Sequence, residues 1–175
     1  MKAITTYKTN KNDRGFTLIE LVVYIAIFGI AMIMISSLTS LIQTGRARNL
    51  AINTVELEGS QAMSQITQLA RNATAITVPV LGGSGASLSM TVYGGTSGAE
   101  QITLSSGVLM LTLSPASPVA LTSTRVVVSG LSIKNNGKTG TNGSVQISFT
   151  LSSVISPSIG SYTKTFTNTA SIRRK

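Results

Sequence analysis

One carboxylate in this chain lies where a carboxylate is energetically costly. Glu20 stands at the beginning of an apolar run, and residues 21–45 that follow it contain no charged side chain. Placing an ionised carboxylate in hydrocarbon costs at least about 2.5–3.5 kcal/mol, so such an acid normally has a partner or a function. Glu20 is therefore the first candidate functional residue, and its expected chemistry is pairing with a positive group.

Few other groups suit catalysis. The chain has no His and no Cys, its one aspartate is Asp13, and its other glutamates are Glu56, Glu58 and Glu100. Glu56 and Glu58 are two residues apart, which on a helix directs them to different sides and makes them a poor acid/base pair. The serines have no histidine to activate them, and clustered acidic ligands for calcium are missing. We predict that the chain is not an enzyme and uses no metal or cofactor.

The run after Glu20 has the length and composition of one membrane span. A helix of about 20 apolar residues crosses a hydrocarbon core of about 30 Å. The preceding segment is basic, with Lys2, Lys8, Lys11 and Arg14 against Asp13. Because basic flanks stay in the cytoplasm, the sequence predicts a single-pass plasma (inner) membrane protein. Its N-terminus would be cytoplasmic and its C-terminal domain extracytoplasmic.

The junction between these two segments carries a family signature. Residues 14–20, Arg-Gly-Phe-Thr-Leu-Ile-Glu, with the basic leader before them and the apolar continuation after them, resemble the type IV pilin and pseudopilin signature. The resemblance implies that a prepilin peptidase cuts between Gly15 and Phe16 and that Phe16 is then N-methylated. It also implies that Glu20 pairs with the terminal amine of a neighbouring subunit. Removing one partner of such a buried pair costs about 3–5 kcal/mol, so Glu20 would fix the register between subunits.

A helical pattern continues beyond the apolar run. Small or apolar residues recur every three or four positions, at Ile52, Val55, Gly59, Ala62, Ile66, Leu69 and Ala73. Such a stripe is typical of a helix that covers a sheet. We predict one helix from Phe16 to about Thr74, with a transmembrane segment at 16–45 and an amphipathic segment at 46–75. Glycines at 29, 45 and 59 are the places where it could bend.

From residue 76 to residue 175 the pattern is that of short strands separated by Gly, Ser, Asn and Pro clusters. The clearest strand is Val145–Ser152, which alternates apolar and polar residues. Further strands are expected at Leu88–Tyr93, Val108–Leu113, Arg125–Ile133 and Tyr162–Thr167. The predicted fold is α+β, with the long helix packed on a C-terminal antiparallel sheet in a pilin-like domain, and residues 1–15 form the leader peptide.

Two absences distinguish this chain from many major pilins. It has no cysteine for a C-terminal disulfide loop, and no proline interrupts its membrane stretch. Residues 121–133 and the strand at Val145 also look like the C-terminal sheet of the larger minor pseudopilins. The resemblance therefore favours a minor pilin or a larger minor pseudopilin.

The basic charge allows a nucleic-acid interpretation. The net charge is +9, and the leader accounts for +3 of it, which leaves +6 after cleavage. Phosphate contacts would fall to Lys134, Lys138 and the C-terminal Arg173, Arg174 and Lys175. These residues are sparse and lack interleaved aromatic side chains, so we favour a solvated surface over DNA binding.

Two functions of different class follow. In the first, the chain is a structural subunit of a type IV pilus, a type II secretion pseudopilus or a competence pseudopilus. Its partners would be prepilin peptidase, other pilin or pseudopilin subunits, an inner-membrane assembly platform with its ATPase, and membrane lipid. It would reach the extracellular filament after assembly.

In the second function, a plain membrane anchor carries a β-domain that binds DNA, glycan or a surface partner without polymerising. An ordinary secretory signal fits poorly, because its apolar core has only about 7–15 residues and ends at a cleavage site.

Overall fold

The computed structural model describes residues 16–92, 99–137, 143–154 and 161–172. The chain divides into two compact units between Gln43 and Thr44. The predicted leader, residues 1–15, lies outside the described residues, as do Lys138, Arg173, Arg174 and Lys175.

Helix α1 (Leu18–Asn72) supplies all the regular structure described in the first unit. Every residue from Phe16 to Gln43 is exposed. The large apolar side chains are included, with Phe28 62% and Ile33 71% exposed. An apolar surface on all sides is the property of a helix that lies in lipid or packs against other helices.

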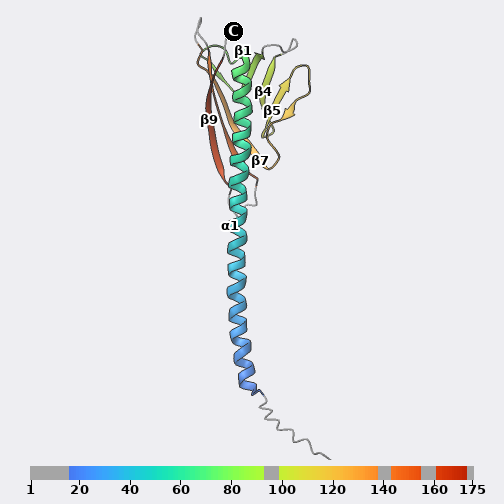
Figure 1. The fold of residues 1–175 in the computed structure, drawn as a ribbon, viewed down its shortest axis with the longest axis vertical. Coiled ribbons are helices and arrows are strands. Elements are labelled where there is room, and N and C mark those ends of the chain that lie inside the picture. The colour runs from blue at the N-terminus through green and yellow to red at the C-terminus, as the bar shows by residue number, and fades with distance from the viewer. Residues whose placement is uncertain (1–15, 93–98, 138–142, 155–160, 173–175) are drawn as a thin grey trace, which may run out of the picture. The chain divides into compact units, whose positions relative to one another are not determined.

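Within the described residues, the second unit combines the remainder of α1 with nine strands in two antiparallel sheets. The first sheet has the order β1-β3-β4-β5-β6 and the second the order β2-β7-β8-β9. The strands are β1 (Ala73–Val78), β2 (Ser84–Gly85), β3 (Ser87–Val92), β4 (Glu100–Ser105), β5 (Val108–Leu113), β6 (Val119–Ala120), β7 (Val126–Asn135), β8 (Ser144–Ser153) and β9 (Thr163–Ser171). In Figure 1 the C-terminal part of α1 has β9 on one side and β4 and β5 on the other. The predicted α+β arrangement of a long helix and antiparallel strands is confirmed.

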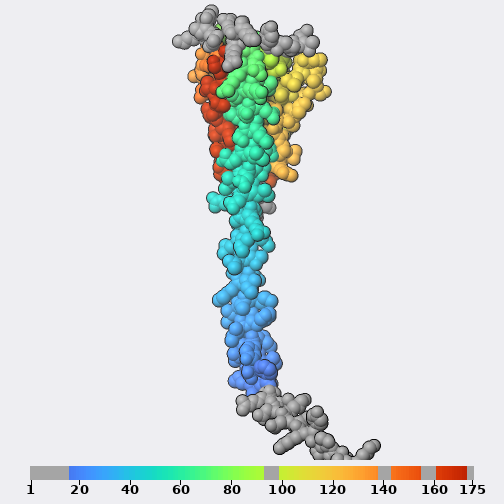
Figure 2. All heavy atoms as spheres, in the orientation of Figure 1, coloured from blue at the N-terminus to red at the C-terminus, as the bar shows by residue number. Residues whose placement is uncertain are grey.

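The core of this unit lies between α1 and the sheets. The helix buries a stripe that includes Val55, Ala62 and Ile66, as the periodicity predicts. Alternate residues of β8, among them Phe149, are buried in the same core cluster as the stripe, and Met90 on β3 is fully buried in it as well. Figure 2 shows α1 as a ridge on this face of the unit, with β9 in red at its side. Period 3.6 on the helix and period 2 on the strands thus build one apolar core.

The end of the helix differs from the prediction. The structure ends α1 at Asn72, and Ala73 is the first residue of β1 instead of the last member of the helical stripe. Ala73 is still fully buried, but it pairs with Val92 on β3. The β-branched residues that follow favour an extended backbone, and pairing with β3 gives them hydrogen bonds that a further helical turn would not.

Several strand boundaries also differ from the prediction. β7 runs on to Asn135 and β9 to Ser171, and one of the Gly- and Ser-rich clusters between the expected strands, at residues 82–85, contains the two-residue strand β2. The prediction missed β4, which pairs with β5 through a two-residue turn at Ser106 and Gly107. Both turn residues have positive φ, 50° and 78°, as the tight hairpin turn that suits twisted strands requires.

Candidate processing and assembly site

The helix start is set by residues next to the predicted cleavage junction. The side-chain hydroxyl of Thr17 accepts a hydrogen bond from the Glu20 backbone N–H at 3.4 Å, and the Thr17 carbonyl accepts one from Leu21 N–H at 3.2 Å. A threonine followed three residues later by a glutamate is the capping-box pattern, which satisfies donors that the first helical turn leaves unpaired. Thr17 therefore acts as the N-cap that begins α1 at Leu18.

Glu20 is placed in the first turn of α1, with its side chain exposed. A negative charge there is favourable because the helix N-terminus carries a partial positive charge. The one side-chain hydrogen bond that the structure gives to this carboxylate comes from the Tyr24 hydroxyl, which donates to Oε1 at 3.4 Å. No ion pair joins Glu20 to a cation among the residues that the structure describes. The carboxylate can thus accept a positive group from another molecule.

The ring of Tyr24, whose hydroxyl donates to Glu20, lies against the ring of Phe16. Their ring centroids are 6.1 Å apart in an edge-to-face arrangement, and Phe16 is 74% exposed. Tyr24 was not among the candidate residues predicted from the sequence. Its spacing could have indicated it, because Tyr24 is four residues after Glu20 and the two side chains therefore lie on the same face of a helix.

One helix of the described chain, α1, is long and apolar enough to cross a membrane, with a mean hydropathy of 2.7 in its most apolar window. Within this helix Glu20 is the one acidic residue before Glu56. The predicted span and the predicted acidic residue therefore belong to a single continuous helix.

The two other helical glutamates bind different strands and loops in the second unit. Glu56 accepts hydrogen bonds from the Lys164 ammonium group at 2.6 and 2.7 Å and from the Tyr162 hydroxyl at 3.1 Å. The bond from Lys164 is the main reason that the pKa of Glu56 lies below its usual value, and the same bond raises the pKa of Lys164. Glu58 instead accepts from the backbone N–H and the hydroxyl of Ser123. These carboxylates fasten α1 to the domain and form no acid/base pair.

Of the predicted phosphate contacts, Lys134 alone lies among the described residues. Lys134 is exposed on β7, opposite Ser84 on β2 and Gln146 on β8. Its four predicted companions, Lys138 and residues 173–175, lie outside the described part of the chain. Across that described part, no group of three or more acidic, His or Cys side chains is arranged to hold a metal ion.

Comparison with known proteins gives one finding at this end of the chain. The family model of the prokaryotic N-terminal methylation motif matches residues 10–36, which include the junction at Gly15 and Phe16 and the carboxylate of Glu20. No curated protein and no solved structure gives a significant match. This motif is typical of pilin-type structural proteins, which suggests a structural rather than a catalytic role. In its motif, its apolar helix that supports membrane anchoring and its α+β fold, this chain is similar to the type IV pilins and pseudopilins.

Proposed function

We propose that this protein is a minor pilin or larger minor pseudopilin that polymerises through Glu20. Prepilin peptidase cuts between Gly15 and Phe16, and the new α-amino group is methylated. Glu20 of one subunit then pairs with the Phe16 amine of its neighbour. The filament is a type IV pilus, a type II secretion pseudopilus or a competence pseudopilus, built by an inner-membrane platform and an assembly ATPase.

The observation that carries this proposal is the position of Glu20 within the methylation motif. The motif match covers the junction and the carboxylate together. The side chain of Glu20 is exposed and has no cationic partner among the described residues. Because an unpaired carboxylate at the edge of a bilayer is costly, a cation from another molecule would relieve that cost. Cleavage creates such a cation, since an α-amino group has a reference pKa of about 7.7–8.0 and is largely protonated at neutral pH.

The exposed apolar surface of the first unit supports polymerisation as well. Its large side chains are exposed, and Leu21, Ile25 and Phe28 among them are each more than half exposed. In the membrane, lipid covers this surface. In a filament outside the membrane, water would contact it unless the same helices of other subunits packed around it.

The proposed topology follows from charge. The basic leader stays in the cytoplasm, the span crosses the plasma (inner) membrane once, and residues 46–175 lie on the extracytoplasmic side. Assembly would move the subunit into an extracellular pilus or a pseudopilus.

The experiment compares Gly15→Leu, Glu20→Gln and the wild-type chain in cells with and without prepilin peptidase. Intact mass and the N-terminal peptide report cleavage and methylation, and sheared surface fractions report incorporation into filaments. We expect Gly15→Leu to keep residues 1–15 and stay in the membrane. We expect Glu20→Gln to be cleaved but not incorporated. Normal incorporation of both variants would contradict the proposal and favour a non-polymerising anchored β-domain.

A further inference from the structure

Three exposed arginines gather at the part of the second unit that follows the apolar run. Arg46 and Arg48 are the first charged residues after Glu20. The fold adds Arg125, which comes from the segment before β7 and lines a groove of about 380 Å³ with Leu50, Thr54, Ser153 and Val154. All three arginine side chains are exposed. We call Arg46, Arg48, Arg125, Leu50 and Val154 the arginine collar.

Helical geometry distributes these charges around α1. Arg46 and Leu50 are four residues apart and share a face, which leads to the groove that contains Arg125. Arg48 is seven residues before the buried Val55 and lies on the face of α1 that the β-domain covers farther along. The collar therefore presents positive charge on more than one side of the helix.

None of these arginines is neutralised by a carboxylate among the described residues. The closest acidic residues along α1 are Glu56, which is ion-paired with Lys164, and Glu58, which accepts two hydrogen bonds from Ser123. The Arg125 backbone N–H donates to the Ser123 hydroxyl, so this loop is held by its backbone and the guanidinium group is left for other contacts. Three uncompensated cations favour an anionic partner.

Aliphatic side chains lie beside the charges. Leu50 is 63% exposed and Val154 is 57% exposed, next to the same groove. Leu50 is five residues beyond Gly45, which corresponds to about 7.5 Å along a helix, and the polar layer on each side of a bilayer is about 5–7 Å thick. Arginine together with aliphatic side chains at that depth is the composition of a surface that contacts lipid headgroups.

We infer that the arginine collar binds the phosphate groups of anionic lipids in the extracytoplasmic leaflet while the subunit is inserted in the membrane, before assembly. Guanidinium groups bind phosphate oxygens in a bidentate manner at the level of the headgroups, beside the aliphatic side chains of Leu50 and Val154. The inference rests on the proposed insertion of residues 21–45 into the bilayer. It makes lipid binding a property of the folded β-domain as well as of the span, because Arg125 and Val154 reach the bilayer surface only through the fold.

The test uses the full chain reconstituted in bilayers. Because the chain has no cysteine, a single Gln43→Cys carries a fluorophore near the bilayer surface. Brominated phosphatidylglycerol and brominated phosphatidylcholine are compared as quenchers, which gives the preference for the anionic lipid around the protein. The variant Arg46→Gln/Arg125→Gln is matched with Arg71→Gln/Lys134→Gln, which removes the same charge from exposed positions elsewhere on the same unit.

We expect the wild-type chain to prefer phosphatidylglycerol and this preference to fall with ionic strength. Loss of each collar arginine should reduce the preference by up to about fivefold, and the matched variant should retain it. An equal loss in both variants would overturn the inference, because it would reflect net charge alone. A wild-type chain that showed no preference for phosphatidylglycerol over phosphatidylcholine would overturn the inference as well.

A nucleic-acid surface is the competing assignment for the collar. If the reconstituted protein bound a short DNA duplex, and if this binding were lost in Arg46→Gln/Arg125→Gln but kept in the matched variant, the lipid assignment would be wrong. The assay does not depend on cleavage or on Glu20. Failure of the chain to insert would contradict the proposed membrane topology, whereas insertion without lipid preference would overturn only the arginine collar.

Discussion

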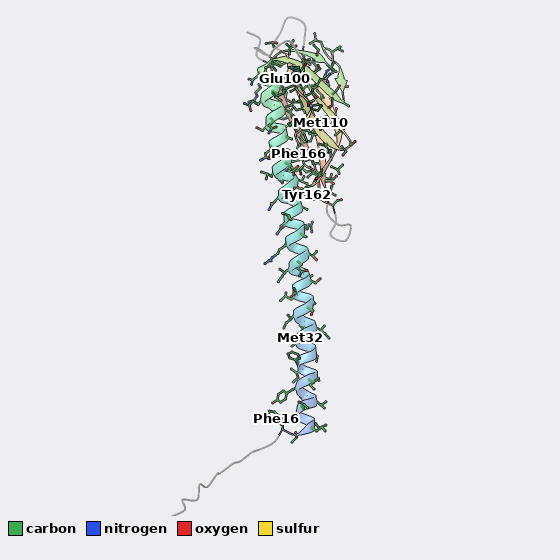
Figure 3. All side chains as sticks on the ribbon, turned by 90° about the vertical axis from the view of Figure 1, so that its right-hand side faces the viewer. Phe16, Met32, Glu100, Met110, Tyr162 and Phe166 are labelled. Atoms are coloured by element: carbon green, nitrogen blue, oxygen red, sulfur yellow. The ribbon has the colours of Figure 1, made fainter. Side chains whose placement is uncertain are left out.

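Gly59 on α1 lies against the ring of Phe166 on β9, so closely that a methyl group at residue 59 would collide with three ring carbons. The ring in turn stacks on the buried Phe149, with centroids 5.8 Å apart. Gly59 is buried within the helical stripe. Figure 3 shows Phe166 beside the C-terminal part of α1. The glycine that the sequence marks as a place of bending is instead a place of close helix-to-sheet packing within a continuous helix.

Gly59→Ala should therefore destabilise the second unit by about 1–3 kcal/mol, the usual cost of an overpacked core. Gly45→Ala is the matched control, because nothing lies within 4 Å of an added Cβ there and alanine is the better helix former. Urea midpoints from pulse proteolysis of the detergent-solubilised chain measure both. Equal midpoints for the two variants would show that the Phe166 ring moves aside at little cost.

The ion pair between Glu56 and Lys164 should make stability depend on pH. Hydrogen bonding from Lys164 lowers the pKa of Glu56 in the folded state, so this contribution is present above the usual carboxyl pKa of 4.5 and is lost as pH falls through the lowered value. The pKa of Lys164 is raised, so its contribution is present below 10.5 and is lost as pH rises through the raised value. We expect Glu56→Gln to weaken the loss of stability at low pH as well as the loss of stability at high pH. Unfolding midpoints across this range, compared with those of Glu58→Gln, measure the effect, and an unchanged pH profile in Glu56→Gln would contradict it.

Glu100 should oppose folding at neutral pH. Burial raises its pKa, and its Oε2 atom has no hydrogen-bond partner among the described residues. Because the folded state holds the proton more tightly, stability should decrease as pH rises above about 4.5 toward the raised pKa. Glu100→Gln should then stabilise the domain at pH 7 by less than about 1 kcal/mol, since the carboxyl group is partly exposed and its charge is screened. A lower unfolding midpoint for Glu100→Gln at pH 7 would indicate that the carboxylate has a stabilising partner.

Substitutions of Tyr24 and of Glu20 should have different effects in an assembly assay. The hydrogen bond from the Tyr24 hydroxyl to Glu20 is long, at 3.4 Å, and so contributes little. The proposed pairing with an amine requires the charge of Glu20 alone. We expect Tyr24→Phe to enter filaments at the wild-type level and Glu20→Gln to enter them at less than about a hundredth of it, given a cost of about 3–5 kcal/mol for an unpaired amine. Equal loss in both variants would assign the role to the tyrosine hydroxyl as well.

The sequence by itself determined the features that repeat along a local stretch of chain. The apolar run, Glu20 at its beginning, the glycine junction before Phe16 and the period of the stripe through Val55 and Ile66 are all readable from neighbouring residues. These patterns were sufficient because helix geometry and membrane thickness relate sequence spacing directly to distance.

Only the tertiary structure decided which distant residues meet. Lys164 binds Glu56 across 108 residues of sequence, and Arg125 lies beside Leu50 at a groove that no local pattern marks. The division of the strands between two sheets, and the start of β1 at Ala73, depend on pairing partners that become adjacent only after folding. Such contacts are set by packing and strand register across the whole domain, and a local sequence pattern does not specify them.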